Sequence, residues 1–178
     1  MRQKRISFLI RQLKAGKKEF FDEFYETTRP AVFYIIRKYT ADFALAEDIM
    51  QEAYISYLNN LDKVDETRNP VSYLMTLVKN KTIDALRKLT PETTEVEAEK
   101  INLQTTDTYS SDMPLLAYAK KMLTDEEYYI LIMTTVYGYR RVEVAKKLNR
   151  PVTTVNRKYN VILKKIEKYY DEVYYEKD

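Results

Sequence analysis

Hydrophobic residues in the first half of the chain recur every three or four positions, which is the period of an α-helix. This spacing predicts helices over residues 6–13, 18–27, 30–39, 44–61 and 71–88. We expect a new helix to start at Pro30, because proline is tolerated in the first turn of a helix. The polar run from Asp62 to Pro70 predicts a loop before the last of these helices.

The second half of the chain has the pattern of a helix-turn-helix. Thr124 and Glu127 have the spacing of a capping box, which satisfies free backbone N–H groups at the start of a helix. A short helix over residues 140–148, a tight turn at 149–151 and a continuous helix over 152–169 are then predicted. A short helix, a tight turn and a longer helix in this order are typical of DNA-binding domains.

Residues 90–112 differ from the sequence on either side. They are polar, acidic, poor in aromatic residues and without sustained periodicity, which is typical of a linker. The linker separates a domain of residues 1–89 from a domain of residues 113–178. With only 2 Gly and 5 Pro in 178 residues, a turn-rich β fold is disfavoured. The sequence therefore predicts an all-α protein, with two small helical bundles joined by a flexible acidic linker.

The chain contains no cysteine and no histidine. This excludes disulfides, thiolate or imidazole metal sites, cysteine nucleophiles and histidine bases. We accordingly expect no catalytic residue, no metal site and no cofactor. Apolar runs are too short for a signal peptide or a membrane span, so we expect a soluble, cytoplasmic protein without membrane insertion.

The net charge of +3 hides strongly charged blocks. Residues 1–20 carry a net charge of +6, residues 91–113 carry −5, and residues 138–168 carry +8. Blocks of opposite sign predict at least two partner surfaces. Unevenly charged solvated faces are the alternative explanation.

One flank of the 44–61 helix combines acidic groups with an isolated apolar residue. Glu47, Asp48, Gln51 and Glu52 lie together there, and Ile55 projects among them. An exposed apolar group with a charged rim is typical of a protein-binding surface. A single exposed isoleucine is also common without any function.

Two other helices carry side chains suited to nucleic acid. The outer face of the 152–169 helix holds groups that can bond base edges or phosphates: Thr153, Asn156, Arg157, Asn160, Lys164 and Lys168. Its inner stripe is expected to be Val155, Tyr159, Ile162, Leu163, Ile166 and Tyr169. The 71–88 helix combines Tyr73 with amides and bases, which favours capture of an unpaired base by stacking and phosphate contacts. A solvated basic helix is the alternative for the former, and a core tyrosine for the latter.

The order and spacing of three strings resemble the first conserved domain of bacterial sigma factors, most closely the extracytoplasmic-function (ECF) subgroup. The strings are AEDIMQEAY at 46–54, NPVSYL at 69–74 and NKTIDALRK at 80–88. In the second half, VAKKL at 144–148 followed by PVTTV at 151–155 is similar to that group's promoter-reading helix-turn-helix.

The resemblance implies that the chain binds core RNA polymerase, recognises promoter DNA and helps to open it. The polymerase-binding residues would be Asp48, Gln51, Glu52 and Ile55. The non-template single strand of the minus-ten element would be bound by the loop 62–69 and by Tyr73, Asn80, Asp84, Arg87 and Lys88. Duplex DNA of the minus-thirty-five element would be read by Thr153, Thr154, Asn156, Arg157, Asn160 and Lys164. An anti-sigma factor would be a further partner.

Two other functions are compatible with the residues. A stand-alone helix-turn-helix regulator would bind duplex DNA without polymerase, as a dimer. A carboxylate-dependent enzyme or metal-binding bundle would use Glu47, Asp48 and Glu52, but these acids fan across a helix flank without a second inward acidic cluster.

Overall fold

The computed structural model describes residues 2–67, 69–89 and 114–174, and the regular secondary structure in these ranges is helical. The predicted all-α fold is therefore confirmed for the described residues. Backbone contacts group the chain into two compact units, Met1–Asp107 and Thr108–Asp178. The predicted linker, residues 90–112, lies outside the described residues.

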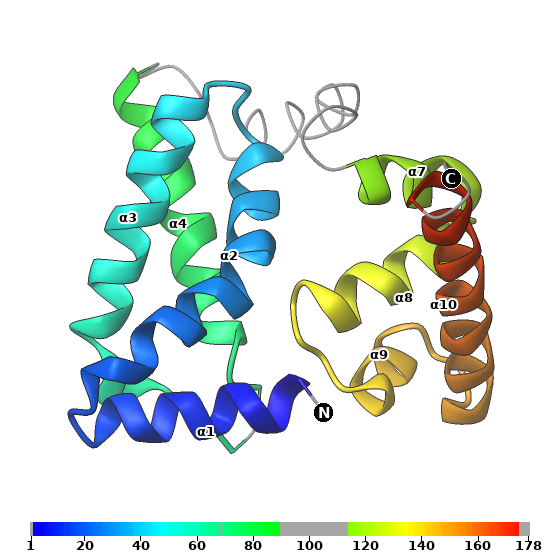
Figure 1. Ribbon diagram of the computed structural model, residues 1–178, viewed down its shortest axis with the longest axis horizontal. Helices are drawn as coiled ribbons and strands as arrows, with labels where there is room; N and C mark the ends of the chain where they lie inside the picture. Colours follow the sequence, from blue (N-terminus) through cyan, green and yellow to red (C-terminus); the bar gives the residue numbers. More distant parts are fainter. Residues whose placement is uncertain (1, 68, 90–113, 175–178) are drawn as a thin grey trace. The chain divides into compact units, whose positions relative to one another are not determined.

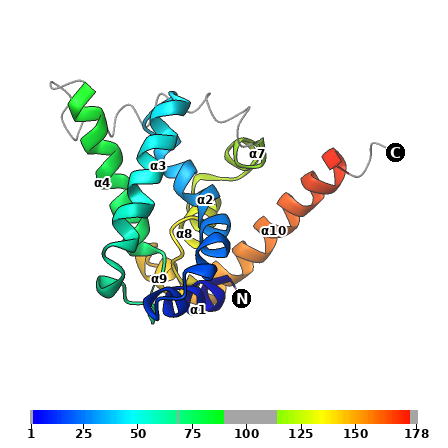
Figure 2. The same ribbon diagram turned by 60° about the vertical axis from the view of Figure 1, so that its left-hand side comes forward.

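The first unit is a bundle of helices with one helix across its end. Its elements are α1 (Arg2–Lys14), the 3₁₀ turn η1 (Lys18–Phe20), α2 (Phe21–Arg37), α3 (Phe43–Leu58), the 3₁₀ turn η2 (Leu61–Lys63) and α4 (Ser72–Leu89). Helices α2, α3 and α4 lie side by side, and α1 lies across one end of them (Figure 1). The same arrangement is visible from a second direction (Figure 2).

Helix α2 continues through Pro30, so the prediction of a new helix at this residue is wrong. A proline inside a helix removes one backbone hydrogen bond and crowds the preceding turn. Pro30 is exposed, whereas Phe24 and Thr28 before it and Val32 and Ile35 after it are buried. Because both halves of α2 bury apolar side chains, packing of the whole helix outweighs the local cost of the proline.

Helix α1 belongs to the core of the first unit. Ile6, Leu9 and Ile10 are almost completely buried. Val64, in the run that was predicted to be a polar loop, is also buried, with 2% of its surface exposed. The connection between α3 and α4 is therefore packed on its inner side, and Leu61–Lys63 within it form the 3₁₀ turn η2.

The second unit contains the predicted helix-turn-helix. Its helices are α7 (Pro114–Met122), α8 (Asp125–Thr135), α9 (Arg141–Lys147) and α10 (Val152–Tyr174). The turn after α9 depends on Asn149, whose φ of 50° is left-handed, and Arg150 N–H donates to the Ala145 carbonyl at 2.9 Å. Asparagine adopts this conformation more readily than most residues.

Helix α10 differs from its prediction in two respects. It continues to Tyr174, beyond the predicted end at residue 169. Leu163, which was expected on the inner stripe, has 42% of its surface exposed. Successive helical residues point about 100° apart. Because Val155 and Ile162 are fully buried, they fix the inner direction, and Leu163 is turned away from it.

A carboxylate at the start of α8 connects the capping box to α10. Glu127 accepts a hydrogen bond from Thr124 N–H at 3.0 Å, and its own N–H donates to Thr124 Oγ1. Lys165 of α10 donates to the same carboxylate at 3.0 Å. Burial by itself would raise the pKa of Glu127, but the Thr124 N–H and the Lys165 ammonium outweigh it and lower this pKa. The neighbouring Glu126 forms a parallel ion pair with Lys158 of α10, at 2.9 Å.

We expect Glu127→Gln to lower the free energy of unfolding of the second unit at pH 7 by about 1–2 kcal/mol, because it weakens charge-assisted hydrogen bonds. The folded-state pKa of Glu127 is lowered, so its contribution is present above the unfolded pKa and is lost as the pH falls through the folded pKa. Urea unfolding followed by circular dichroism should show the two proteins converging in acid. Glu167→Gln, at an exposed position of α10, is the matched control. A stability difference that is the same at all pH values would contradict this account.

Candidate functional site

The predicted polymerase-binding residues share one exposed stripe of α3. Asp48, Gln51, Glu52 and Ile55 are all exposed, and their spacing of three or four residues places them on the same face. Ile55 has 59% of its surface exposed. The opposite face is fixed by complete or nearly complete burial of Ala46, Ile49, Met50 and Ala53. The core of the unit thus dictates which α3 residues meet solvent, and we call these four the α3 stripe.

The predicted minus-ten residues lie along α4. Asn80, Asp84, Arg87 and Lys88 are exposed, and Tyr73 is half-buried at the first turn of the helix. Asp84 and Arg87 form an ion pair at 4.0 Å. We call these five residues the α4 stripe; buried Leu74, Met75 and Val78 face the core of the unit.

Tyr73 is oriented by the aromatic core beneath it. Its ring contacts that of Tyr57, with 6.0 Å between ring centroids and an interplanar angle of 44°. Tyr57 is fully buried and in turn stacks on Phe24 of α2 at 5.2 Å. A half-exposed aromatic ring supported from below presents a fixed apolar surface to solvent. Such a surface suits stacking with a planar ligand.

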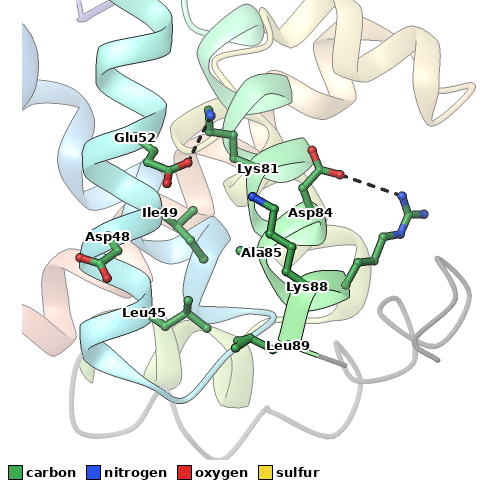
Figure 3. Close-up of a pocket in the computed structure, with 10 residues that line it drawn as sticks. Leu45, Asp48, Ile49, Glu52, Lys81, Asp84, Ala85, Lys88 and Leu89 are labelled. Atoms are coloured by element: carbon green, nitrogen blue, oxygen red, sulfur yellow. Dashed lines mark hydrogen bonds and ion pairs between the residues drawn. The ribbon is translucent and has the colours of Figure 1, made fainter. Parts of the chain in front are cut away.

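The α3 and α4 stripes meet in one cleft, which sequence reasoning did not reveal. The cleft has a volume of about 490 Å³ and a partly apolar lining that includes Leu45, Ile49, Ala85 and Leu89 (Figure 3). Its charged groups come from both helices: Asp48 and Glu52 from α3, and Lys81, Asp84, Arg87 and Lys88 from α4.

An ion pair crosses this cleft. Lys81 Nζ lies 3.3 Å from a carboxylate oxygen of Glu52 (Figure 3). Both side chains are at least partly exposed, so the pair contributes little to stability. Its consequence is electrostatic, because the acidic groups of α3 and the basic groups of α4 lie on opposite sides of one cleft. Glu52 and Lys81 are 29 positions apart in the sequence, so no local sequence signal could have predicted that they meet.

The predicted minus-thirty-five residues lie on the first half of α10. Thr153, Arg157, Asn160 and Lys164 are exposed at spacings of three or four residues and form one stripe. Thr154 and Asn156 lie on either side of it and are half-buried. The six residues thus form a continuous surface with a central line that we call the α10 stripe, made of Thr153, Arg157, Asn160 and Lys164.

In the described ranges, no group of three or more His, Cys, Asp and Glu residues is arranged to hold a metal ion. None of the helices described is both long enough and apolar enough to cross a membrane.

Comparisons with known proteins point to one family. Residues 24–91 match the model of the family described as sigma-70 region 2. Over 83 residues, the chain is 30% identical to the ECF RNA polymerase sigma factor SigW of Bacillus subtilis (strain 168), covering 47% of this chain and 44% of that protein. Over 159 residues, it is 21% identical to the ECF RNA polymerase sigma factor SigK of Mycobacterium tuberculosis (strain H37Rv), covering 84% of this chain and 85% of that protein.

A similar solved structure is that of CnrH in complex with the cytosolic domain of CnrY. It has a TM-score of 0.48 and 17% sequence identity, and the match covers 93% of this chain and 97% of that chain. The match to SigW, and a second one to SigK of Mycobacterium ulcerans (strain Agy99), each span less than half the length of the relative, 44% in both cases.

Proposed function

We propose, from the premise that this chain belongs to the ECF sigma factors, that it binds core RNA polymerase and directs it to selected promoters. The matches to sigma-70 region 2, SigW and SigK support this premise, and they agree with the resemblance noted in the sequence. The observation that carries the proposal is the pair of exposed stripes on adjacent helices within the region 2 match, one acidic with an apolar anchor and one basic with an aromatic. In this role the chain breaks no covalent bond, and it acts in the cytoplasm together with RNA polymerase.

The α3 stripe is the proposed docking surface for polymerase. Ile55 supplies an apolar anchor that becomes buried on binding, and Asp48 and Glu52 supply a charged rim. Rim charges of this kind steer association and fix the register of the complex more than they add affinity. The fitting partner is therefore a basic surface with a small apolar recess. An anti-sigma factor that covered this stripe would compete with polymerase for it.

The α4 stripe is the proposed binding surface for the non-template strand of the minus-ten element. Tyr73 offers a supported ring for stacking, Asn80 offers an amide for base edges, and Arg87 and Lys88 offer charges for phosphates. A base can stack on Tyr73 only after it has left the duplex. Binding free energy gained from unstacked bases therefore favours the melted promoter. Asp84 forms an ion pair with Arg87 on the same stripe.

The α10 stripe is the proposed reader of the minus-thirty-five duplex. The amino-terminal part of a recognition helix enters the major groove, and this part carries Thr153 and Arg157. Arginine bonds guanine and asparagine bonds adenine with bidentate geometry, which assigns base reading to Arg157 and Asn160. Lys164, about two turns further along, is suited to a phosphate.

We expect the double substitution Asp48→Lys with Glu52→Lys to abolish binding to core RNA polymerase without unfolding the protein, because both side chains are exposed. Co-elution from a sizing column at sub-micromolar concentration measures binding, and circular dichroism measures the fold. Asp22→Lys with Glu26→Lys is the matched control, since it reverses two exposed acids at the same spacing on α2.

Two results would count against polymerase docking through α3. The first is unchanged co-elution of the Asp48 and Glu52 variant. The second is a wild-type protein that does not bind polymerase but binds duplex DNA tightly by itself, which would favour the stand-alone regulator.

On the second unit, we expect Arg157→Ala and Lys164→Ala to have different effects on binding of holoenzyme to duplex promoter DNA. Loss of a base-reading arginine should cost about 1–3 kcal/mol and relax the preference at one base pair. Loss of a phosphate contact should weaken binding to all sequences equally and reduce its salt dependence by about one unit of slope. Competition binding at several salt concentrations separates the two. Equal effects of both variants on every sequence would refute base reading by Arg157.

A further inference from the structure

Side chains of helix α1 hold the connection between α3 and α4. Lys14 Nζ donates to the Val64 carbonyl at 2.6 Å and to Glu66 Oε2 at 2.7 Å. Ser7 Oγ donates to the Glu66 carbonyl at 2.7 Å. Ser7 and Lys14 are two helical turns apart, so they lie on the same face of α1. Two side chains of α1 thus clamp Val64 and Glu66 of the connection, which lie 50 or more residues away in sequence.

These contacts are separate from those that hold α1 in the unit. Burial of Ile6, Leu9 and Ile10 anchors the helix, and an ion pair between Arg5 and Glu23 joins it to α2. Removing the charge of Lys14 therefore leaves the anchors of α1 in place. What it removes is the pair of hydrogen bonds to the connection.

Tyr73 follows the clamped segment, Val64–Thr67, in the sequence. Within it, Asp65 Oδ1 accepts hydrogen bonds from the N–H and the hydroxyl of Thr67, at 2.9 and 2.6 Å. After it in the chain, Asn69 Oδ1 accepts from Val71 N–H at 3.2 Å, immediately before α4 begins. A displacement of the clamped carbonyls would therefore change the loop that precedes the first turn of α4, where Tyr73 lies.

Lys14 also neutralises the charge of this segment. Its hydrogen bond to Glu66 lowers the pKa of that carboxyl group, and its ammonium group compensates the carboxylate charge. Both side chains are about three-quarters buried. Without Lys14, an uncompensated carboxylate would face any phosphate backbone that approaches the connection, and like charges repel.

We propose that Ser7 and Lys14 are positioning residues for recognition of the single-stranded minus-ten element, because they hold the Val64–Thr67 segment in the conformation that reads an unpaired base. This inference rests on the proposed function, which assigns the strand to the α4 stripe, and it extends that assignment to the connection before α4. It gives the basic amino-terminal helix a defined part in promoter selectivity.

The test uses holoenzyme reconstituted from core RNA polymerase and the full chain. The probe is a single-stranded DNA library randomised over ten consecutive positions, and sequencing of the bound fraction gives the preference at each position. We expect Lys14→Met to reduce the preference at one position by about tenfold, the size of one lost base discrimination. Ser7→Ala should reduce it at the same position by about threefold, as expected for one neutral hydrogen bond.

Two variants serve as controls. Arg5→Met removes the same charge from the same helix but breaks only the contact with α2, so its base preferences should match the wild type. Lys14→Arg keeps a donor and a charge at the same place and should retain the preference. Thermal unfolding and polymerase co-elution of every variant show whether fold and docking are intact.

The outcomes distinguish a failure of the inference about Ser7 and Lys14 from a failure of the proposed function of α4. Unchanged preferences in both Lys14→Met and Ser7→Ala would overturn the inference, as would a uniform loss of affinity that is equal in Arg5→Met. If Lys14→Met fails to fold, the milder Ser7→Ala decides alone. If the wild-type holoenzyme enriches no sequence at all, the proposed function of α4 fails first, and the inference fails with it.

Discussion

The packing of α3 against α4 is the contact on which the candidate surfaces of the first unit depend. The two helices run antiparallel, with Leu45 near Leu89 at one end of their cleft and Glu52 paired with Lys81 further along. Each helix buries one face, so the choice of exposed face is not free. The α3 and α4 stripes are what remains in solvent once the apolar side chains are packed. A single core therefore positions both the proposed polymerase-docking surface and the proposed strand-binding surface.

The second unit uses charge as well as apolar packing to orient its DNA-facing helix. Ala119, Ile130, Val144, Val155 and Ile162 form a common core. Glu126 and Glu127, adjacent at the start of α8, each bind a lysine of α10. Two ion pairs at different points along α10 thus add directional contacts to this apolar packing. The face of α10 opposite both kinds of contact is the one that carries the α10 stripe.

Local sequence patterns predicted the helices and the direction in which their faces point. The α3 and α10 stripes were predictable because the period of an α-helix converts spacing directly into a face. The Thr124–Glu127 capping box was predictable for the same reason, since it involves only neighbours. Pro30 misled the prediction because its local cost is outweighed by burial on both sides of it, which depends on other helices. The shared cleft and the grip of Lys14 on Val64 and Glu66 join residues far apart in sequence and leave no local signal.

The most direct measurement of the central claim is in vitro transcription with mapping of RNA 5′ ends, using genomic DNA of the organism that encodes the chain. Core RNA polymerase is assayed with and without the protein. If the protein is a promoter-specificity subunit, it will create a new set of start sites that share two short sequence elements upstream. If core polymerase starts at the same places with and without the protein, although the two proteins bind each other, the claim is wrong.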